Sequence, residues 1–315
     1  MKIGLLGTGF GVAHAGIYHR HPAVDEVIVF GRTQAKLDKI AADFGFATTT
    51  ELDTIYDDPA IDLVDVCLPT RLHADHVIRG LDAGKHVLCE LPLADNLADA
   101  QRIVDADTAS DKDVFVDMFG RFDPSTELLH AAIADERYGL LKTFESELRS
   151  ALLWEGYEIR LDSIAIDVMH SSLDTIVTAL GRPDSTTAIG VEKDSGGSAA
   201  DALLHYPGTT VRCSASALMP KHYGMRGGYR ATFTDAVLES SWTAGYDGRP
   251  ATALTEYTDE AQRTIELPIA DAYTAVIEHV IACLQDRAAS RLTPASALDT
   301  LRVTLDIHNA LNPRD

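Results

Sequence analysis

Short apolar runs alternate with helical patterns along residues 1–118. One helical segment, TQAKLDKIAADFG, begins at Thr33, a typical N-cap residue, and ends at Gly45, a typical C-cap residue. The apolar runs, each short enough to be a buried strand, are KIGLLGTG, VDEVIVFGR, DLVDVCLPT, HVLCE and DVFVDMF. Strands and helices in alternation, joined by short loops, predict a doubly wound parallel sheet of the α/β class.

The pattern changes after residue 118. From Ser185 to Leu267, strand-like runs are separated by turn residues, and YPGT is typical of a hairpin turn. Helical patterns precede this stretch, including SIAIDVMHSSLDTIVTALG, and two helices close the chain. We therefore expect two domains: residues 1–118 with the parallel sheet, and residues 119–315 with an α+β fold on a mostly antiparallel sheet.

Composition agrees with a two-domain globular protein and excludes several partners. The chain has 315 residues, of which 46% are apolar and 24% charged. No apolar run is long enough to cross a bilayer and no signal-peptide pattern is present, so we expect a cytoplasmic protein. The four cysteines form no CxxC pair, which favours reduced thiols. The net charge of −21 argues against nucleic acid and against an anionic membrane as partners.

A glycine-rich turn directly follows the first predicted strand. Gly7 and Gly9 stand where a dinucleotide-binding fold needs a tight turn and a close approach of the backbone to a pyrophosphate. The third glycine of the G-x-G-x-x-G pattern would fall at Val12, and the nearest glycine is Gly11. The order of strand, turn and helix favours a nucleotide site that includes Thr8 and Phe10 of this turn. The alternative is a strand-to-helix turn without a ligand.

The end of the second predicted strand bears on the choice of cofactor. A carboxylate at this place would hydrogen-bond the 2′-hydroxyl of the NAD ribose. The sequence has instead Arg32 and Thr33, with Lys36 one helical turn further on. Because these side chains can hold a 2′-phosphate, we expect NADP, with NAD as the second possibility. The alternative is that Arg32 is a solvated loop residue.

Four longer motifs resemble those of one enzyme family. They are GTGFG followed by HA, VCLPTRLHADHVIRGLDAGKHVLCELPLA, MFGRFDP, and AIDVMHSSLDTIVTALGRP. These motifs are similar to motifs of the Gfo/Idh/MocA family, the relatives of glucose–fructose oxidoreductase and inositol dehydrogenase, along essentially the whole chain. The resemblance implies an N-terminal Rossmann domain and a C-terminal domain with a large open sheet. It also implies hydride transfer between a nicotinamide cofactor and a carbon of a sugar, cyclitol or related polyol.

The resemblance also assigns residues to the cofactor cleft. Besides Gly7 and Gly9, it implies that Pro69, Thr70, His73, Glu90 and Pro92 line this cleft. Pro69 and Thr70 follow the third predicted strand, at the carboxyl edge of the sheet, where ligands bind such folds. We expect no metal site, because no carboxylate or thiolate completes a set with the nearby pair of His73 and His76.

The chain departs from the family at two places. Leu91 stands where relatives carry the lysine of an EKP motif, which lies near the nicotinamide and assists substrate orientation or proton transfer. In the helix that relatives begin with D-x-G-x-H-x-x-D, Ser171 holds the usual histidine position and His170 precedes it. Asp167 and His170 lie three residues apart, so on a regular helix they share a face and form a candidate acid/base pair. The alternative is that His170 merely packs between the domains.

Further residues are candidates for the substrate side. They are Leu91, Arg121, Trp154, Tyr157 and Ser171, of which the two aromatic residues are of the kind that stacks on a sugar ring. A basic, aromatic cluster, PKHYGMRGGYR, contains Lys221 and Arg230 in an otherwise acidic chain. It is either an exposed sheet edge or a surface that reaches the substrate or a neighbouring subunit.

Two classes of function follow from these observations. The first is an NADP-dependent oxidoreductase acting on a sugar-like alcohol or ketone, in which His170 and Asp167 replace the missing lysine. The second is a cofactor-binding sensor or regulator without turnover, which Leu91 favours. A third possibility is a redox-neutral reaction on tightly bound nucleotide. Because relatives pair through the open sheet, we also expect a homodimer or homotetramer.

Overall fold

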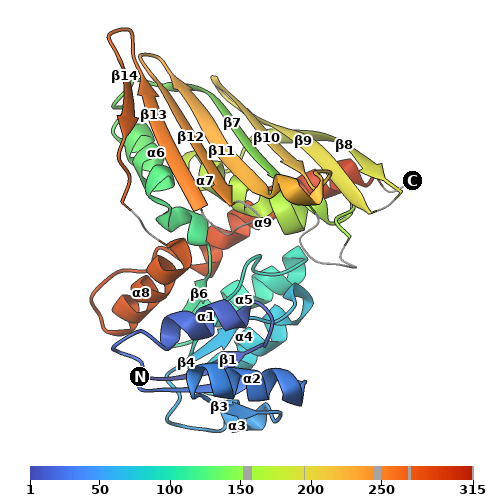
Figure 1. Cartoon of the computed structure of the whole chain (residues 1–315), viewed down its shortest axis with the longest axis vertical. Coiled ribbons are helices and arrows are strands. Elements are labelled where there is room, and N and C mark those ends of the chain that lie inside the picture. The colour runs from blue at the N-terminus through green and yellow to red at the C-terminus, as the bar shows by residue number, and fades with distance from the viewer. Residues whose placement is uncertain (152–157, 195, 245–249, 269–270, 314–315) are drawn as a thin grey trace. The chain divides into compact units, whose positions relative to one another are not determined.

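A computed structural model describes residues 1–151, 158–194, 196–244, 250–268 and 271–313. It divides into two compact units (Figure 1). The first unit contains Met1–Phe119 and Asp271–Leu298, and the second contains Gly120–Ala270 and Asp299–Asp315. Among the described residues, no helix is both long and apolar enough to cross a membrane.

The first unit is built on a six-stranded parallel sheet with the order β3-β2-β1-β4-β5-β6. The strands are β1 (Lys2–Leu6), β2 (Glu26–Phe30), β3 (Ala47–Thr49), β4 (Leu63–Val66), β5 (His86–Cys89) and β6 (Val114–Val116). The doubly wound parallel sheet is confirmed, with the change of direction between β1 and β4. Ligands bind such sheets at the carboxyl ends of the strands beside this point.

The helices of the first unit follow the expected pattern of alternation. They are α1 (Gly11–Tyr18), α2 (Gln34–Phe44), α3 (Asp53–Tyr56), α4 (His73–Asp82), α5 (Leu97–Ala109) and α8 (Ala272–Leu284). Thr33 is the N-cap residue of α2 but makes no side-chain capping bond, and Gly45 ends the helix in the left-handed conformation. The predicted local signals at the ends of this helix therefore mark its true bounds.

The segment Asp271–Leu298 returns to the first unit. The sequence had predicted a single boundary between the two domains, after residue 118. The apolar side of α8, which includes Val276 and Val280, is buried. The segment after the helix also pairs with the sheet, because Val116 N–H donates to Leu292 O at 2.8 Å. This burial and this hydrogen bond explain why the segment belongs with the first sheet.

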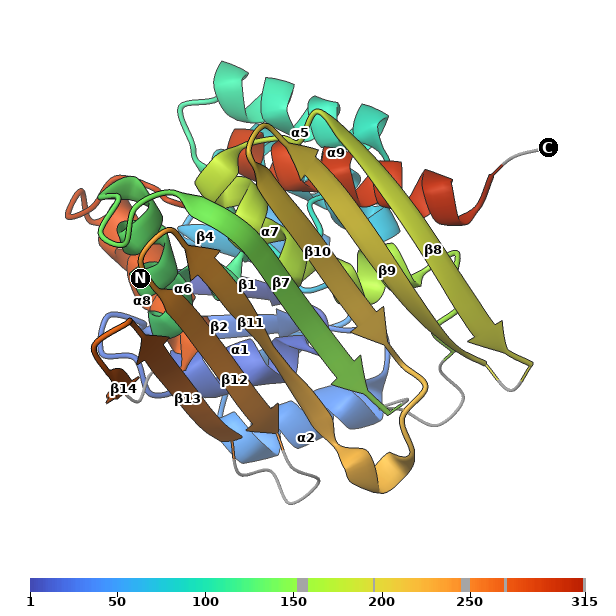
Figure 2. The same ribbon diagram turned by 90° about the horizontal axis from the view of Figure 1, so that it is seen from above.

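The second unit is built on an eight-stranded sheet with the order β14-β13-β12-β11-β7-β10-β9-β8 (Figure 2). The strands are β7 (Leu141–Ser150), β8 (Ser185–Lys193), β9 (Gly197–Tyr206), β10 (Thr209–Ser216), β11 (Met225–Phe233), β12 (Val237–Ala244), β13 (Pro250–Tyr257) and β14 (Gln262–Ile265). All neighbours are antiparallel except β7 and β10, so the expected mostly antiparallel sheet is confirmed.

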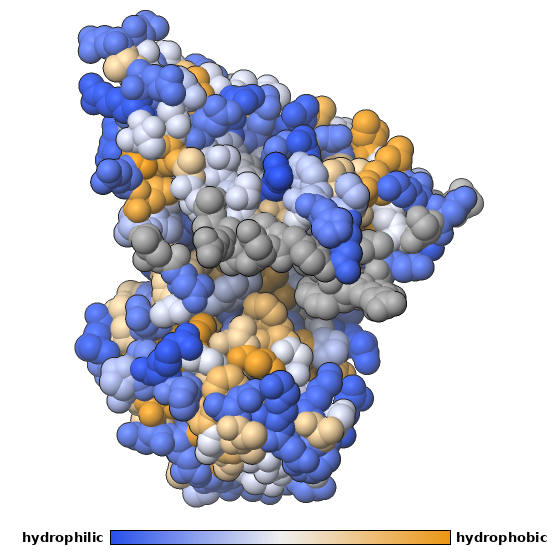
Figure 3. All heavy atoms as spheres, in the orientation of Figure 1, coloured by the Kyte–Doolittle hydropathy of each residue, from blue (hydrophilic) through white to orange (hydrophobic). Residues whose placement is uncertain are grey.

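One face of this sheet is covered by α6 (Pro124–Ala134), α7 (His170–Leu180) and α9 (Pro294–Leu311) (Figures 1 and 2). Apolar side chains of the strands and helices, such as Phe144, Leu173 and Ile307, form the core between these layers. The opposite face carries charged pairs such as Arg230–Glu239 at 2.7 Å. Ile189 and Val191 of β8 are 76% and 62% exposed, and apolar atoms gather over β8 and β9 in Figure 3. Part of this sheet is therefore an uncovered apolar surface.

Candidate cofactor and active site

The glycine turn after β1 has the geometry that a bound dinucleotide requires. Gly7 has a φ of 122°, and a Cβ there would lie 2.2 Å from Cys67 O, so only glycine fits. A Cβ at Gly9 would meet nothing within 4 Å, so the backbone of the turn faces open space. This combination of a tight turn and an approachable backbone matches the first two glycines of the dinucleotide pattern.

Gly11 takes the place of the third glycine, although it stands one position early. A Cβ on Gly11 would lie 3.2 Å from Cys67 Cβ and 3.4 Å from Leu5 Cδ1, so its absence lets α1 pack closely on the sheet. Val12, the position expected from the motif, is instead 38% exposed. Close packing between helix and strand is the role of the third glycine, and here the neighbouring residue performs it.

The loop after β2 lies against the glycine turn. A Cβ at Gly31 would lie 2.4 Å from Thr8 Cγ2, which shows how closely the two loops approach. Arg32, Thr33 and Lys36 follow on this loop and on α2, and all three are exposed. Within the described part of the chain, neither Arg32 nor Lys36 has an ion-pair partner. Two cations are therefore available to an anion beside the turn.

The loops after β4 and β5 are joined by His73. Its Nδ1 lies 2.9 Å from Pro92 O and its Nε2 lies 2.8 Å from Leu68 O. Burial lowers the pKa of His73, while the two carbonyl oxygens act in the opposite direction. The ring is 1% exposed and each nitrogen faces a backbone carbonyl oxygen, so His73 joins the two loops from within.

The other residues expected in these loops remain available. Pro69 is exposed and Thr70 is half-buried, both beyond the carboxyl end of β4. Leu91 is half-buried, Pro92 is buried, and the peptide bond between them is cis. The carboxyl edge of the sheet therefore carries Pro69, Thr70 and Leu91 near its surface.

Glu90 does not turn to this surface but into a buried polar cluster. Its Oε2 accepts a hydrogen bond from Leu91 N at 3.0 Å, and its Oε1 lies 3.3 Å from His14 Nε2. Asp117 Oδ2, at the end of β6, also lies 3.3 Å from His14 Nε2. On the other side of the ring, His14 Nδ1 lies 2.8 Å from Asp65 Oδ2. We call these residues, together with Cys67 at the end of β4, the His14 cluster.

The electrostatics of the His14 cluster are strongly perturbed. Burial raises the pKa of Glu90 to about 7, against the opposing effect of His14, and burial likewise raises the pKa of Asp117. Burial disfavours the charged form of His14, but the charges of Asp65 and Cys67 outweigh it and raise the pKa of the ring. Sequence reasoning missed this cluster. The signal was an acidic residue inside or directly after each of two buried strands, Asp65 and Asp117.

In the second unit, His170 is buried and held by α9. Its Nδ1 lies 2.8 Å from Thr304 Oγ1, and Thr304 Oγ1 donates its proton to Thr300 O at 2.9 Å. The hydroxyl must therefore accept from Nδ1–H, which leaves a lone pair on Nε2. This Nε2 atom has no hydrogen-bond partner among the described residues. Burial lowers the pKa of His170 to about 4, so the ring is neutral at physiological pH.

The expected pairing of His170 with Asp167 is not formed. Asp167 is exposed, whereas His170 is 1% exposed, and the carboxylate that raises the pKa of His170 is Asp174. The reason is local: Ala165–Met169 forms a π-helical turn before α7. Such a turn holds more residues than an α-helical one, so residues three apart no longer share a face.

Arg121, expected on the substrate side, instead forms a buried ion pair. Its Nε and Nη2 donate to the two oxygens of Asp174 at 2.8 and 2.7 Å, and the side chains are 4% and 3% exposed. Thr300 also donates to Asp174, at 2.7 Å. Ser171 is half-buried on α7. Trp154 and Tyr157 lie outside the described residues.

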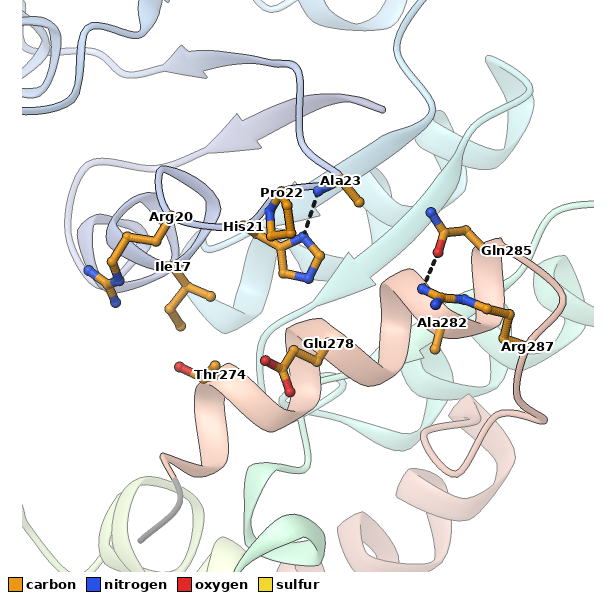
Figure 4. Close-up of a pocket in the computed structure, with 10 residues that line it drawn as sticks. All are labelled: Ile17, Arg20, His21, Pro22, Ala23, Thr274, Glu278, Ala282, Gln285 and Arg287. Carbon is orange, nitrogen blue, oxygen red and sulfur yellow. Dashed lines mark hydrogen bonds between the residues drawn. The ribbon is translucent and has the colours of Figure 1, made fainter.

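A surface pocket of about 790 Å³ lies elsewhere, between the end of α1 and α8 (Figure 4). Its wall is largely polar and charged, with Arg20, His21, Thr274, Glu278, Gln285 and Arg287, and the rest of it is apolar. Of the residues expected to bind cofactor or substrate that the structure describes, none contributes to its wall. It is therefore not part of the candidate site.

Comparison with known proteins agrees with the geometry of the first unit. A family model described as "Oxidoreductase family, NAD-binding Rossmann fold" (GFO_IDH_MocA) matches residues 1–118. This is the family whose motifs the sequence resembles, and the match covers the part of the chain that holds the parallel sheet. The chain's named relatives include a D-xylose 1-dehydrogenase (NADP(+)) of Haloferax volcanii, 26% identical over 97% of this chain and 95% of the relative.

Other similarities are shorter or lie in the fold alone. A 4-carboxy-2-hydroxymuconate-6-semialdehyde dehydrogenase of a Sphingobium species is 33% identical, over 42% of this chain and 43% of the relative. This chain therefore spans less than half of that protein. The crystal structure of UDP-N-acetylglucosamine 3-dehydrogenase from Acidithiobacillus ferrooxidans superimposes with a TM-score of 0.84 at 19% identity, over 99% of this chain and 97% of that one.

Proposed function

We propose that this chain is a member of that family, an NADP(H)-preferring oxidoreductase that acts on a sugar, cyclitol or related polyol or ketone. The observation that carries the proposal is a pair of exposed cations without ion-pair partners among the described residues, Arg32 on the loop that abuts the glycine turn and Lys36 in the first turn of α2. A 2′-phosphate beside the turn gains charge-assisted hydrogen bonds from both. The name of the Haloferax relative, which states NADP, supports the same choice.

In this proposal the first unit holds the cofactor at the carboxyl edge of its sheet. The turn from Gly7 to Phe10 binds the pyrophosphate through backbone N–H groups and the start of α1. Pro69 and Thr70 line the site beside it. The bound nicotinamide supplies hydride chemistry, and the chain supplies orientation and proton transfer.

We propose His170 as the proton acceptor for a substrate hydroxyl. Its Nε2 carries a lone pair, because Nδ1–H is bound to Thr304, and the low pKa keeps that lone pair free of a proton. A base of this kind assists alcohol oxidation without the lysine that Leu91 replaces. His170 Nε2 would accept the proton of the hydroxyl oxygen, and the oxidised nicotinamide would accept the hydride of the adjoining carbon, which becomes a carbonyl carbon.

Replacing Arg32 by Ala tests the cofactor preference. The variant should bind NADPH more weakly by about 1–3 kcal/mol, the range of a hydrogen bond to a charged group, while NADH binding stays nearly unchanged. Lys39→Ala is the matched control, because Lys39 lies on the same helix but is paired with Asp43 at 2.8 Å. Fluorescence titration measures the affinities of the native chain and of both variants for NADPH and for NADH. Equal losses for the two cofactors would contradict the NADP assignment.

A second candidate is a cofactor-binding sensor without turnover, and Leu91 favours it. A leucine has neither a charge nor a proton to give to the reacting oxygen. A broad screen of sugars, cyclitols and ketones, coupled to NADPH, separates the two functions. If neither the native chain nor Leu91→Lys turns over any compound while both bind NADPH, the sensor becomes the better account.

We also propose that two or four copies associate through the uncovered face of the second sheet. Ile189, Val191 and Leu203 expose apolar surface on β8 and β9, which a second copy would remove from water. Light scattering at micromolar concentration measures the mass. Val191→Lys should shift it toward the monomer, and a monomeric native chain would refute the association.

A further inference from the structure

We propose that Glu90 and Asp117 share one buried proton, and that a dinucleotide binds more tightly at the glycine turn when this proton is present. The shared proton belongs to the free chain and depends only on residues of the first unit. Its effect on affinity rests on the proposed function, because it requires that NADP(H) binds at the turn. Separate measurements therefore test the proton and its effect.

Two carboxyl groups of the His14 cluster converge on one hydrogen-bond donor. Glu90 Oε1 and Asp117 Oδ2 each lie 3.3 Å from His14 Nε2, so these two oxygens are at most twice 3.3 Å, or 6.6 Å, apart. The ring can offer them only one N–H, because its Nδ1 lies 2.8 Å from Asp65 Oδ2. Among the described residues, His14 is the only ion-pair partner of either group. One positive charge therefore faces two carboxyl groups that repel each other when both are ionised.

These two carboxyl groups are also short of hydrogen bonds. Asp117 is fully buried, and neither of its oxygens has a hydrogen-bond partner among the described residues. Glu90 Oε1 is a buried atom that likewise has none. A buried carboxylate without donors is unfavourable, whereas a protonated carboxyl group is neutral and can itself donate. A proton on one of the two groups therefore removes the second negative charge and supplies a donor.

Asp65 is the opposite case within the same cluster. It accepts hydrogen bonds from Tyr18 at 2.8 Å and from Cys67 at 3.4 Å, besides its contact with the imidazole. Donors therefore reach both of its oxygens, and Asp65 needs no proton of its own. Because Asp65 and the charged imidazole balance each other, the excess of negative charge lies on Glu90 and Asp117. The shared proton therefore belongs to these two groups.

The other titratable groups that face this pair, among the described residues, supply no positive charge. They are the thiols of Cys67 and Cys89, the phenols of Tyr18 and Tyr273, and the carboxyl group of Asp271. Burial raises the pKa of both thiols and both phenols, so these four groups are neutral near pH 7. Burial also raises the pKa of Asp117, with a smaller contribution from Asp271, and it raises the pKa of Glu90 to about 7. The pair therefore gains and loses its proton near neutral pH.

The His14 cluster lies against the glycine turn. The ring of His14, on α1, meets the ring of Phe10 in the turn edge to face, with centroids 5.8 Å apart. Glu90 Oε2 accepts a hydrogen bond from Leu91 N at 3.0 Å, at the same carboxyl edge of the sheet. A phosphate at the turn therefore adds negative charge beside a cluster that already has an excess of it.

The direction of the coupling follows from the repulsion between like charges. A phosphate at the turn disfavours the ionised form of the pair and so favours the form that holds the proton. By linkage, the chain with the proton binds the dinucleotide more tightly than the chain without it. We therefore expect proton uptake when NADPH binds, and an affinity that falls as the pH rises through about 7, where Glu90 ionises.

Infrared pH-difference spectra of the full-length chain without nucleotide test the shared proton. At pH 6 ordinary carboxyl groups are ionised, so the C=O stretch of a protonated carboxyl group reports on unusual groups such as this pair. The native chain should lose such a band between pH 6 and pH 8.5. Glu90→Gln should lack it, because Asp117 alone then faces His14. Identical difference spectra for the native chain and Glu90→Gln would overturn the proposal.

Two further variants assign the band to this pair. Glu278→Gln makes the same change at an exposed residue of the first unit and should keep the band. If Glu90→Gln fails to fold, as circular dichroism would show, Asp117→Asn takes its place and should lack the band as well. Loss of the band in Glu278→Gln, or its persistence in folded Asp117→Asn, would contradict the assignment.

Calorimetric titration with NADPH, in two buffers of different ionisation enthalpy, tests the coupling. At pH 7.5 the native chain and Glu278→Gln should take up about half a proton for each nucleotide bound, and Glu90→Gln close to none. Between pH 6 and pH 8.5, the affinity of the native chain should fall about five- to tenfold relative to that of Glu90→Gln. Equal uptake by the native chain and Glu90→Gln would refute the coupling. A chain that shows the infrared band but binds neither NADPH nor NADH would support the shared proton and contradict the proposed function.

Discussion

The two units each bury a polar network, but only one of the networks is balanced in charge. In the second unit, Arg121 and Asp174 neutralise each other through two hydrogen bonds, and two threonine hydroxyls also donate to Asp174 Oδ1. In the first unit, three carboxyl groups share one imidazole, and several of their atoms remain unpaired among the described residues. A network that is balanced in charge, as in the second unit, is satisfied by its own groups. A network with an excess of carboxyl groups, as in the first unit, needs a proton or a ligand.

The exception in the balanced network is informative. Among the described residues, His170 Nε2 has no hydrogen-bond partner, although Nδ1 of the same ring is bonded to Thr304. A single unpaired nitrogen on a ring that is held in place by Thr304 is suited to accept a proton from a substrate. The proposed function uses this nitrogen for proton transfer, whereas the unpaired atoms of the first unit lie among an excess of carboxyl groups.

The largest expected effect comes from removing this nitrogen. His170→Ala should lower kcat by about 10²–10⁴-fold, the usual contribution of a positioned acid or base, with NADPH affinity unchanged. His170→Asn keeps a donor near Thr304 but lacks the Nε2 lone pair, and it should lose as much activity. Steady-state kinetics and NADPH titration measure both properties. Full activity in His170→Asn would show that His170 only packs.

Breaking the buried ion pair should affect stability rather than binding. Arg121→Ala leaves Asp174 buried without its cation and should lower the free energy of unfolding by about 3–5 kcal/mol. Arg212→Ala, which removes an exposed pair with Glu145 at 3.5 Å, should cost less than about 1 kcal/mol. Denaturant unfolding followed by circular dichroism compares the two. Similar losses in both variants would contradict the expected difference between the buried and the exposed ion pair.

Acid should lower the stability of the fold because it favours the protonated form of His170, which is disfavoured in the buried site. The pKa of this ring is about 4 in the folded chain, against an ordinary value of 6.5, because burial disfavours the charged form. The contribution of the neutral ring to the free energy of unfolding is therefore complete above pH 6.5. It is lost as the pH falls from 6.5 to 4, by about 3 kcal/mol in total. His170→Asn should remove this part of the pH dependence. A constant difference in stability between the native chain and this variant from pH 7 to pH 5 would refute it.

The sequence predicted what depends on local pattern. The alternation of strands and helices, the positions of Thr33 and Gly45, and the turn at Gly7 all follow from neighbouring residues. The strand β3 was missed because its three residues, Ala47–Thr49, have no apolar run to mark it. A short polar strand at the edge of a sheet is recognised only in the structure, where its hydrogen bonds to the neighbouring strand, here β2, can be seen.

The candidate site was harder to predict because its contacts are distant in sequence. Thr304 fixes the ring of His170 from 134 positions away, and no local pattern indicates this partner. The expected pairing with Asp167 assumed a regular helix, and the π-helical turn removed it. Asp65 and Asp117 would ordinarily indicate wet strand faces, and only the packed fold shows that both are buried.

The return of Asp271–Leu298 to the first unit has a consequence for synthesis of the chain. The first unit begins to emerge from the ribosome early, but the helix that buries Val276 and Val280 follows only after Gly120–Ala270 has been made. At about 5–20 residues per second, this interval lasts on the order of ten seconds or more. During that time the apolar surface that α8 will cover stays open to water, to chaperones and to other nascent chains.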